Sequence, residues 1–505
     1  MSSGRRFAHG VSSSWLSLFI IAAIQIWQIR LARTHLPDSE FAMFGVLSSI
    51  VSTLLIAEVG VRSAFARLLI DARVSAESEY RQFWSSAVAV FAGQAILIAL
   101  LCAACIPMIS AWFPIPPELL GTARLILAAQ GVVTVIGYAF GIHSIALLAT
   151  QRFVFLNFSA IACAIAGFLL FWIGIKSGAG LWSYIFFGIP GTLFACVLLP
   201  LVTRRAGISR IFSIGNVSAP QVRRLFSLGF DLFFVSLYNL VLAHAMLIYA
   251  GALLPLAVVS IVTVNLKLVQ LATQCLQKIP GTADPMLSQM IATGALARFR
   301  PSWLILAKTA MGLTLVGAGV AYLWAGYVIS HWTSPADILS GWELLLISLL
   351  PLRYIVHIVC VLSTTMFKAI NQLRGAMVAE LLVYSALAFG LGGRWGLRGL
   401  LIANLLSLLF GSLIPGLRLI AKLGGYAPRD LFAAVCRILV PGLLIVFAIP
   451  LANSSPESLS LPARCGWTLA WLLAVGGCLW FVGFSHAERV QLLSRLPSRK
   501  TTAAD

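Results

Sequence analysis

The sequence predicts an all-α, polytopic membrane protein. Apolar stretches of bilayer-spanning length fill the chain of 505 residues almost from end to end, and no break between them is long enough for a folded soluble domain. Hydrophobic residues make up 60% of the chain and charged residues only 10%, and the mean hydropathy is +0.97. So much apolar surface cannot be covered by so little polar surface in water. A transmembrane β-barrel is excluded because the apolar runs are too long and do not alternate.

A helix that crosses ~30 Å of hydrocarbon needs ~20 apolar residues. Runs of this length predict about fourteen transmembrane helices. They cover residues 11–33, 41–61, 83–110, 120–148, 154–175, 181–202, 225–250, 256–277, 302–330, 339–366, 375–392, 397–417, 431–451 and 466–484. The glycine-rich stretch 390–399 must turn within a few residues if two helices, rather than one kinked helix, lie there.

The first apolar run is expected to be a membrane span rather than a cleavable signal peptide. Arg5 and Arg6 precede it, but the run continues through Ile29 without a small-residue cleavage site and ends in Arg30 and Arg33. The nine cysteines lie mostly within apolar runs, and no paired spacing suggests disulfides or a metal site. We therefore expect neither a metal nor a cofactor.

Basic residues are distributed unevenly between alternate loops. The chain has 35 Lys and Arg against 16 Asp and Glu, a net charge of +19. A cytoplasmic N-terminus assigns 26 of the basic residues to the cytoplasmic side and 7 to the outer side. By the positive-inside rule, this split predicts that both termini are cytoplasmic. The membrane topology accounts for the basic surplus, so nucleic-acid binding is not expected.

Weak internal duplication predicts two parallel six-helix lobes. Leu36-Pro37 separates the first two predicted spans, and Leu254-Pro255 separates the seventh and eighth. Six spans per unit preserve orientation, so the lobes are related by an axis along the membrane normal. The predicted parts are an N-terminal lobe (1–210), a C-terminal lobe (211–424), and two additional helices with a cytoplasmic tail (425–505). Chance recurrence of Pro and Arg in loops is the alternative interpretation.

Residues 27–70 (WQIRLARTHLPDSEFAMFGVLSSIVSTLLIAEVGVRSAFARLLI) resemble the first hairpin of polysaccharide flippases of the O-antigen translocase (Wzx) type. In that family a helix ends in a basic residue, a turn precedes an aromatic-glycine pair, and a second helix closes with glycine and arginine. The matching residues here are Arg30, Arg33, Phe44-Gly45, Gly60, Arg62 and Arg67. The loop 150–153 and the segment 279–290 are also similar to that family, and the resemblance extends over residues 10–430.

The resemblance implies membership of the multidrug/oligosaccharidyl-lipid/polysaccharide exporter superfamily and a fold with two lobes around a central cavity. It implies a flippase in the bacterial cytoplasmic (inner) membrane. The implied substrate is a polyprenyl-pyrophosphate-linked glycan, moved from the cytoplasmic to the outer leaflet by alternating access for O-antigen or exopolysaccharide biosynthesis. The implied partners are this glycolipid, membrane lipids, and a glycan polymerase or other assembly proteins.

Other function classes fit the sequence less well. A membrane glycosyltransferase, polymerase or ligase needs catalytic acids or nucleophiles on a substantial outer loop. The predicted outer loops, such as 112–118 and 453–464, are short and largely lack such groups. No GxxxxGK[ST] loop for ATP is present. A drug/cation antiporter of the same superfamily is the main alternative, but it requires acidic residues in the cavity. A scaffold for a glycan-assembly complex is a third class.

The clearest polar stripe inside a predicted span lies at 256–277. Its members are Thr263, Lys267, Gln270, Gln274 and Gln277. The spacings of 4, 3, 4 and 3 put them on one helical face. We predict that this face is the wall of a hydrated cavity in which Lys267 binds a substrate phosphate and Gln270 and Gln274 contact sugars. The alternative is a hydrogen-bonded seam between helices.

Further candidates for substrate binding are Arg353, Arg30, Gln28 and Arg62. Arg353 alternatively lies near the outer interface, Arg30 is alternatively an interface anchor, and Arg62 alternatively forms a structural salt bridge near a span end.

Candidates for coupling to a proton or sodium ion are Asp231, His357 and Glu380, since ionisable groups inside membranes are costly and commonly functional. His357 is alternatively a hydrogen-bonded core histidine, and Asp231 and Glu380 are alternatively salt-bridge partners near span ends.

Overall fold

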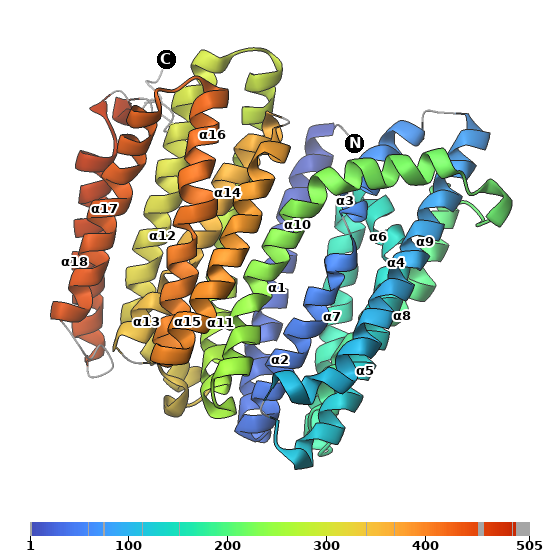
Figure 1. Cartoon of the computed structure of the whole chain (residues 1–505), viewed down its shortest axis with the longest axis horizontal. Helices are drawn as coiled ribbons and strands as arrows, with labels where there is room; N and C mark the ends of the chain where they lie inside the picture. Colours follow the sequence, from blue (N-terminus) through green and yellow to red (C-terminus); the bar gives the residue numbers. More distant parts are fainter. Residues whose placement is uncertain are drawn as a thin grey trace, which may run out of the picture. The chain divides into compact units, whose positions relative to one another are not determined.

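The computed structural model of the chain is all-helical and contains no strand among the residues that it describes (Figure 1). These are residues 3–490 except 59, 74–75, 114, 151, 340, 368, 453–458 and 487. Side chains are not described at 3–12, 56, 71, 231–232, 235–236, 239–243, 278, 281–282, 284–285, 289, 292 and 449–452. The predicted fold class, a polytopic all-α membrane protein, is confirmed.

The chain divides into two compact units, Met1–Val264 and Asn265–Asp505. The first unit contains α1 (Ser3–His35), α2 (Asp38–Leu54), η1 (Leu55–Glu58), α3 (Val61–Ala72), α4 (Glu77–Trp112), α5 (Pro117–Ala139), α6 (Gly141–Ala149), α7 (Phe153–Lys176), α8 (Trp182–Leu193), η2 (Phe194–Leu198), α9 (Leu199–Arg205), η3 (Ile214–Asn216) and α10 (Ala219–Leu253). Helix α11 (Leu256–Ala292) starts in this unit and continues into the second.

The second unit continues with α12 (Leu296–Trp332), η4 (Pro335–Asp337), α13 (Gly341–Ser348), α14 (Leu350–Met366), η5 (Ile370–Leu373), α15 (Arg374–Ser407), η6 (Leu409–Leu413), α16 (Ile414–Gly424), α17 (Pro428–Ala452), α18 (Leu461–Cys478) and η8 (Leu479–Gly483). The first unit extends past the predicted lobe boundary at residue 210 because α10 packs on α2, α3 and α4. Gly60, with φ +67°, permits part of this packing, since a Cβ there would overlap the Gly229 carbonyl oxygen. The lobe boundaries themselves stay a prediction.

Eleven helices in the described part of the chain are long and apolar enough to cross a membrane. The predicted spans 41–61 and 225–250 are not among them, because α2 has only 17 residues and much of the middle of α10 has side chains outside the description. The segment Ile370–Gly424 counts once, although the sequence predicts two spans there. Every other predicted span overlaps one of the eleven helices, but the predicted span 120–148 is divided between α5, which ends at Ala139, and α6.

The chain reverses direction within α15. Gly396 has φ +57° and ψ −133°, which is not helical, and a Cβ on Gly399 would overlap the Leu391 carbonyl oxygen. Residues eight apart in a straight helix are separated by ~12 Å, so this approach requires a turn between them. Two antiparallel helices therefore lie here, as the two predicted spans require. Only glycine adopts this backbone conformation at low cost.

Aromatic residues form the core of the first unit between α3, α4 and α5. Phe65 packs on Phe83 and Phe91, with ring centroids 5.7 and 5.8 Å apart, and Tyr138 stacks on Phe91 at 5.5 Å. This core also contains a buried hydrogen bond, in which the Tyr138 hydroxyl donates to Gln94 Oε1 over 2.6 Å. The aromatic contacts and this hydrogen bond hold α4 and α5 together.

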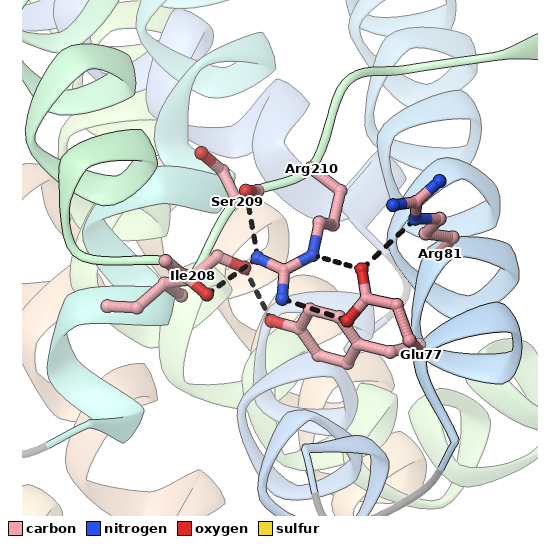
Figure 2. A network of polar contacts seen from close by, with 7 residues as sticks. Glu77, Arg81, Ile208, Ser209 and Arg210 are labelled. Atoms are coloured by element: carbon pink, nitrogen blue, oxygen red, sulfur yellow. Dashed lines mark hydrogen bonds and ion pairs between the residues drawn. The ribbon is translucent and has the colours of Figure 1, made fainter.

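Figure 2 shows the hydrogen bonds and ion pairs between the segment after α9 and the first turn of α4. Arg210 Nε and Nη2 donate to the two carboxylate oxygens of Glu77 over 2.8 and 3.1 Å, and Arg81 Nε donates to Glu77 over 3.0 Å. Arg210 also donates to the Gly207 carbonyl over 2.6 Å. The hydrogen bonds that Arg210 donates to the Glu77 carboxylate raise the pKa of Arg210. This bidentate ion pair holds the segment that connects α9 and α10 against α4.

In the second unit, α17 and α18 pack on α12 (Figure 1). Small residues on α12 make room for large ones, since Gly312 faces Leu479 and Gly319 faces the indole of Trp471. Trp471 Nε1 donates to the Val316 carbonyl over 3.1 Å. The two C-terminal helices therefore belong to the same compact unit as α12.

Candidate functional site

Lys267 lies in the continuous helix α11, eleven residues after its start. Its side chain is half-buried, and within the described part of the chain it makes neither a hydrogen bond nor an ion pair. Gln270 is half-buried and Gln274 is exposed. The helical periodicity puts these two amides on the same face as Lys267. This face combines an ammonium group that no described carboxylate compensates with one half-buried and one exposed amide.

The remainder of the predicted stripe differs in character. Thr263 is buried, and its hydroxyl donates to the Val259 carbonyl over 2.8 Å, so its polarity is satisfied within the helix. Gln277 is half-buried. The next turn is anchored on its opposite side, where buried Asn265 donates to the Asp337 carbonyl over 2.9 Å. The stripe is therefore buried at Thr263 and partly exposed from Lys267 onward.

A second polar cluster lies in the core of the unit Asn265–Asp505. Arg353 Nε on α14 donates to Glu380 Oε1 on α15 over 3.2 Å, and the ion pair places Nη2 at the same distance from that oxygen. Ser412 Oγ in η6 donates to Glu380 Oε2 over 2.8 Å and lies 3.1 Å from His357 Nδ1. The Arg353 guanidinium also lies 4.7 Å from the centre of the Tyr384 ring. We call Arg353, His357, Glu380 and Ser412 the buried polar cluster.

All four members of the buried polar cluster are at most 2% exposed. The structure thus brings together three residues that the sequence singled out separately, namely Arg353, His357 and Glu380. Gly411 is what admits the carboxylate, since a Cβ there would overlap Glu380. The charge of Arg353 is balanced by the carboxylate of Glu380, whereas no described carboxylate pairs with Lys267.

The N-terminal candidates lie in the unit Met1–Val264. Gln28 is buried in α1. Arg30 is exposed, with its guanidinium 5.7 Å from the Trp27 ring centre, an arrangement typical of an interface anchor. Arg33 forms an ion pair with Asp38 across the turn into α2. Arg62 is half-buried, 5.9 Å from the Tyr138 ring centre.

Asp231 is part of α10, but its side chain lies outside the described residues.

The structure contains a buried ion pair that the sequence did not predict. Lys308 on α12 is 3% exposed, and its ammonium lies 2.8 Å from Glu488 Oε2 and 2.9 Å from the Gly483 carbonyl oxygen. The sequence assigned Lys308 to a cytoplasmic helix end and left Lys267 as the lysine deep in a span. The position of Lys308 inside the predicted span 302–330 indicates that this lysine needs a partner within the membrane. Nothing in the sequence pointed to Glu488 as its partner, 180 residues away.

No protein-family model matches the sequence, and no curated protein matches it either. The fold, by contrast, resembles solved structures of transporters. The lipid II flippase MurJ in an inward closed conformation superposes with a TM-score of 0.63 at 13% identity, covering 93% of this chain and 98% of that one. A variant of the Vibrio cholerae MATE transporter VcmN gives 0.60 at 14% identity, covering 85% and 98%.

An inward-facing multidrug resistance MATE family transporter of the MOP superfamily gives a TM-score of 0.59 at 13% identity, covering 81% of this chain and 96% of that one. At these identities the likeness is one of fold. The chain therefore has the membrane-transporter fold shared by a lipid II flippase and MATE transporters.

Proposed function

We propose that this protein is a flippase that moves a polyprenyl-pyrophosphate-linked glycan from the cytoplasmic to the outer leaflet of a bacterial inner membrane. The observation that carries the proposal is Lys267, a half-buried cation inside a membrane-spanning helix with no hydrogen bond or ion pair in the described part of the chain. The likeness in fold to a lipid II flippase supports the same class of transport.

The argument from Lys267 is one of charge compensation. A lysine at the centre of a membrane span costs ~2.5–3.5 kcal/mol on insertion scales. Lys308 and Arg353 offset this cost with the carboxylates of Glu488 and Glu380. Lys267 has no such partner among the described residues, so an anion that binds and leaves is the counter-charge that we propose. A lipid pyrophosphate supplies that anion inside the membrane.

The two amides beside Lys267 suit the remainder of the substrate head. Sugar hydroxyls that leave water must regain hydrogen bonds, because an unpaired buried hydroxyl costs ~1–3 kcal/mol on protein scales. Gln270 and Gln274 each carry both donors and an acceptor. The polyprenyl tail is expected to remain in the bilayer while two lobes alternate the access of the head group.

The membrane potential gives direction to this transport. It is worth ~2.3 kcal/mol per charge per 100 mV, negative inside, so outward movement of an anionic head is favoured. If cationic side chains of the protein neutralise the anionic head group, the membrane potential acts instead on the substrate-free protein. It then favours return of the positively charged site toward the cytoplasmic side. Asp231, His357 and Glu380 are the candidates for an additional proton or sodium step, and the buried polar cluster joins the last two through Ser412.

A drug/cation antiporter is the second candidate, favoured by the likeness in fold to MATE transporters. A cationic substrate requires an acidic group that is not already neutralised. Glu380 is paired with Arg353, whereas Lys267 would repel a cation. The charge of the described intramembrane residues therefore favours an anionic substrate.

The test uses proteoliposomes that contain the full chain and a fluorescent polyprenyl-pyrophosphate glycan. We expect Lys267→Gln to lower translocation at least tenfold, because it removes the charge and keeps a polar side chain, and Lys267→Arg to retain measurable activity. The matched control is Lys422→Gln, which removes the same charge from an exposed position in the last turn of α16 and should leave translocation unchanged.

Full translocation by folded Lys267→Gln removes Lys267 from the site. Exchange of a cationic dye for protons, without movement of the glycolipid, replaces the proposal by the antiporter.

A further inference from the structure

The unit Met1–Val264 contains a pocket of about 180 Å³ between α2, α5 and α8. Its polar lining consists of Ser48, Ser52, Gln130, Thr134 and Tyr184. Apart from buried Tyr184, these residues are half-buried, so the pocket is reachable from the surface of this unit. None of its lining residues carries a formal charge. The mechanism proposed above makes no use of this pocket.

The pocket contains hydrogen-bonding groups that the described residues do not satisfy. Gln130 Nε2 donates to Ser48 Oγ over 3.1 Å, but Gln130 Oε1 is buried and has no hydrogen-bond partner in the described part of the chain. The hydroxyls of Ser52, Thr134 and Tyr184 make no hydrogen bond within the described residues.

Neighbouring hydroxyls behave differently. Thr53 on α2 and Thr192 on α8 each donate to the carbonyl four residues earlier, over 2.8 and 3.0 Å. This is the usual way for a helical threonine to satisfy its hydroxyl. A buried polar atom left unpaired costs ~1–3 kcal/mol, so Gln130 Oε1 favours a partner outside the described part of the chain. The hydroxyls of Ser52, Thr134 and Tyr184 line the same pocket and are available to that partner.

The geometry of the pocket suits a small ring. Tyr184 is held between Phe44 and Phe171, whose ring centroids lie 3.4 and 4.9 Å from its own. These contacts restrict the Tyr184 side chain, so a hydrogen bond from a ligand to its hydroxyl costs little side-chain conformational entropy. A cavity of ~150 Å³ is known to accept benzene, so this pocket has room for a single six-membered ring.

We infer that the pocket binds one neutral sugar ring. Hydroxyl and amide groups without a charge match the alternating donors and acceptors of a pyranose, and offer no counter-charge to a phosphate or an ammonium. The inference rests on the proposed function for the source of this sugar, a residue of the lipid-linked glycan. A free glycoside has the same chemistry, so the experiment separates the two sources.

The test compares Thr134→Val/Tyr184→Phe with wild type, using the full chain in lipid nanodiscs. Both substitutions remove a hydroxyl and nearly preserve shape, and Tyr184→Phe keeps the contacts with Phe44 and Phe171. The probes are polyprenyl-pyrophosphate-N-acetylglucosamine, polyprenyl pyrophosphate without sugar, and methyl β-glucopyranoside followed by saturation-transfer NMR. The matched control is Thr53→Val, which removes a hydroxyl that is already bonded within α2.

We expect the double variant to bind the sugar-bearing lipid roughly tenfold more weakly, as the loss of two neutral hydrogen bonds implies. It should bind the sugar-free lipid like wild type and lose saturation transfer to the glucoside. Lys267→Gln should weaken both lipids equally. Wild-type affinity of the double variant for the sugar-bearing lipid overturns the inference and leaves the proposed function intact.

If wild-type protein binds no lipid pyrophosphate, the proposed function fails, and the glucoside alone decides the inference. Saturation transfer that the double variant loses supports a sugar site. The absence of transfer to wild type overturns it.

Discussion

Arg353 and Glu380 form an ion pair in the interior of the second unit, where each side chain is at most 1% exposed. In such surroundings the loss of one partner leaves a buried charge without compensation, which costs ~3–5 kcal/mol. Replacement of both partners by apolar side chains of similar size is often close to neutral. The pair therefore offers a direct test of how this bundle balances charge.

We predict that Arg353→Met and Glu380→Met each destabilise the second unit by about 3–5 kcal/mol. The double variant should be more stable than either single variant, because it leaves no unpaired charge. Thermal unfolding of purified protein, followed by fluorescence-detected size exclusion, measures the difference. A double variant as unstable as the sum of the two single effects would show that the pair is not coupled.

At the scale of single residues, sequence patterns identified chemistry but not partners. The intramembrane positions of Arg353, His357 and Lys267 follow from hydropathy alone. That Arg353 meets Glu380 while Lys267 meets no carboxylate among the described residues depends on how α11, α14 and α15 pack. Arg353 and Glu380 are 27 residues apart in the sequence, and no local periodicity encodes that contact.

At the scale of helices, the packing of α17 and α18 on α12 depends on close approach. Gly319 leaves the space that the Trp471 indole fills, and Gly483 packs on Ile438 of α17. A polar contact also joins α12 to α18, since Trp324 Nε1 donates to Thr468 over 2.8 Å. Small residues and buried polar contacts are the usual means of helix association in membranes, where apolar surface alone gives little preference for protein over lipid.

We predict that Gly319→Leu lowers the stability of the second unit, by about 1–3 kcal/mol as in overpacked cores, because its side chain would overlap Trp471. Gly317→Leu is the control on the same helix, since a Cβ there meets no atom within 4 Å. Thermal unfolding midpoints of the two variants should differ clearly. Equal midpoints would mean that Trp471 moves aside without cost.

The reversal at Gly396 shows the limit of hydropathy at this scale. A window of apolar residues continues through the segment Ile370–Gly424, so composition alone does not separate one long helix from two. The glycine-rich stretch 390–399 marked the turn, and the positive φ of Gly396 explains why glycine is needed there.

At the scale of the whole molecule, orientation in the membrane follows from charge. The predicted cytoplasmic loops and helix ends contain 26 basic residues against 7 on the other side. We predict that reporters fused after Arg210 and after Lys500 behave as cytoplasmic and that a reporter within 453–461 behaves as external. The last two sites lie outside, or mostly outside, the described residues.

Alkaline phosphatase and green fluorescent protein fusions report the two sides of the membrane. Reporters after Arg210 and after Asn453 on the same side would contradict the predicted succession of spans.

The sequence by itself determined that this is an all-helical membrane protein, because hydropathy and charge act through the solvent that each residue requires and need no knowledge of its neighbours. It also identified the polar stripe of α11, since a helix has a fixed period. The tertiary structure alone decided which charges are paired, as in Lys308 with Glu488, and which hydroxyls of α2, α5 and α8 converge on one pocket. These are contacts between residues far apart in the chain, and their energies depend on distance and burial in the folded bundle, which no local pattern specifies.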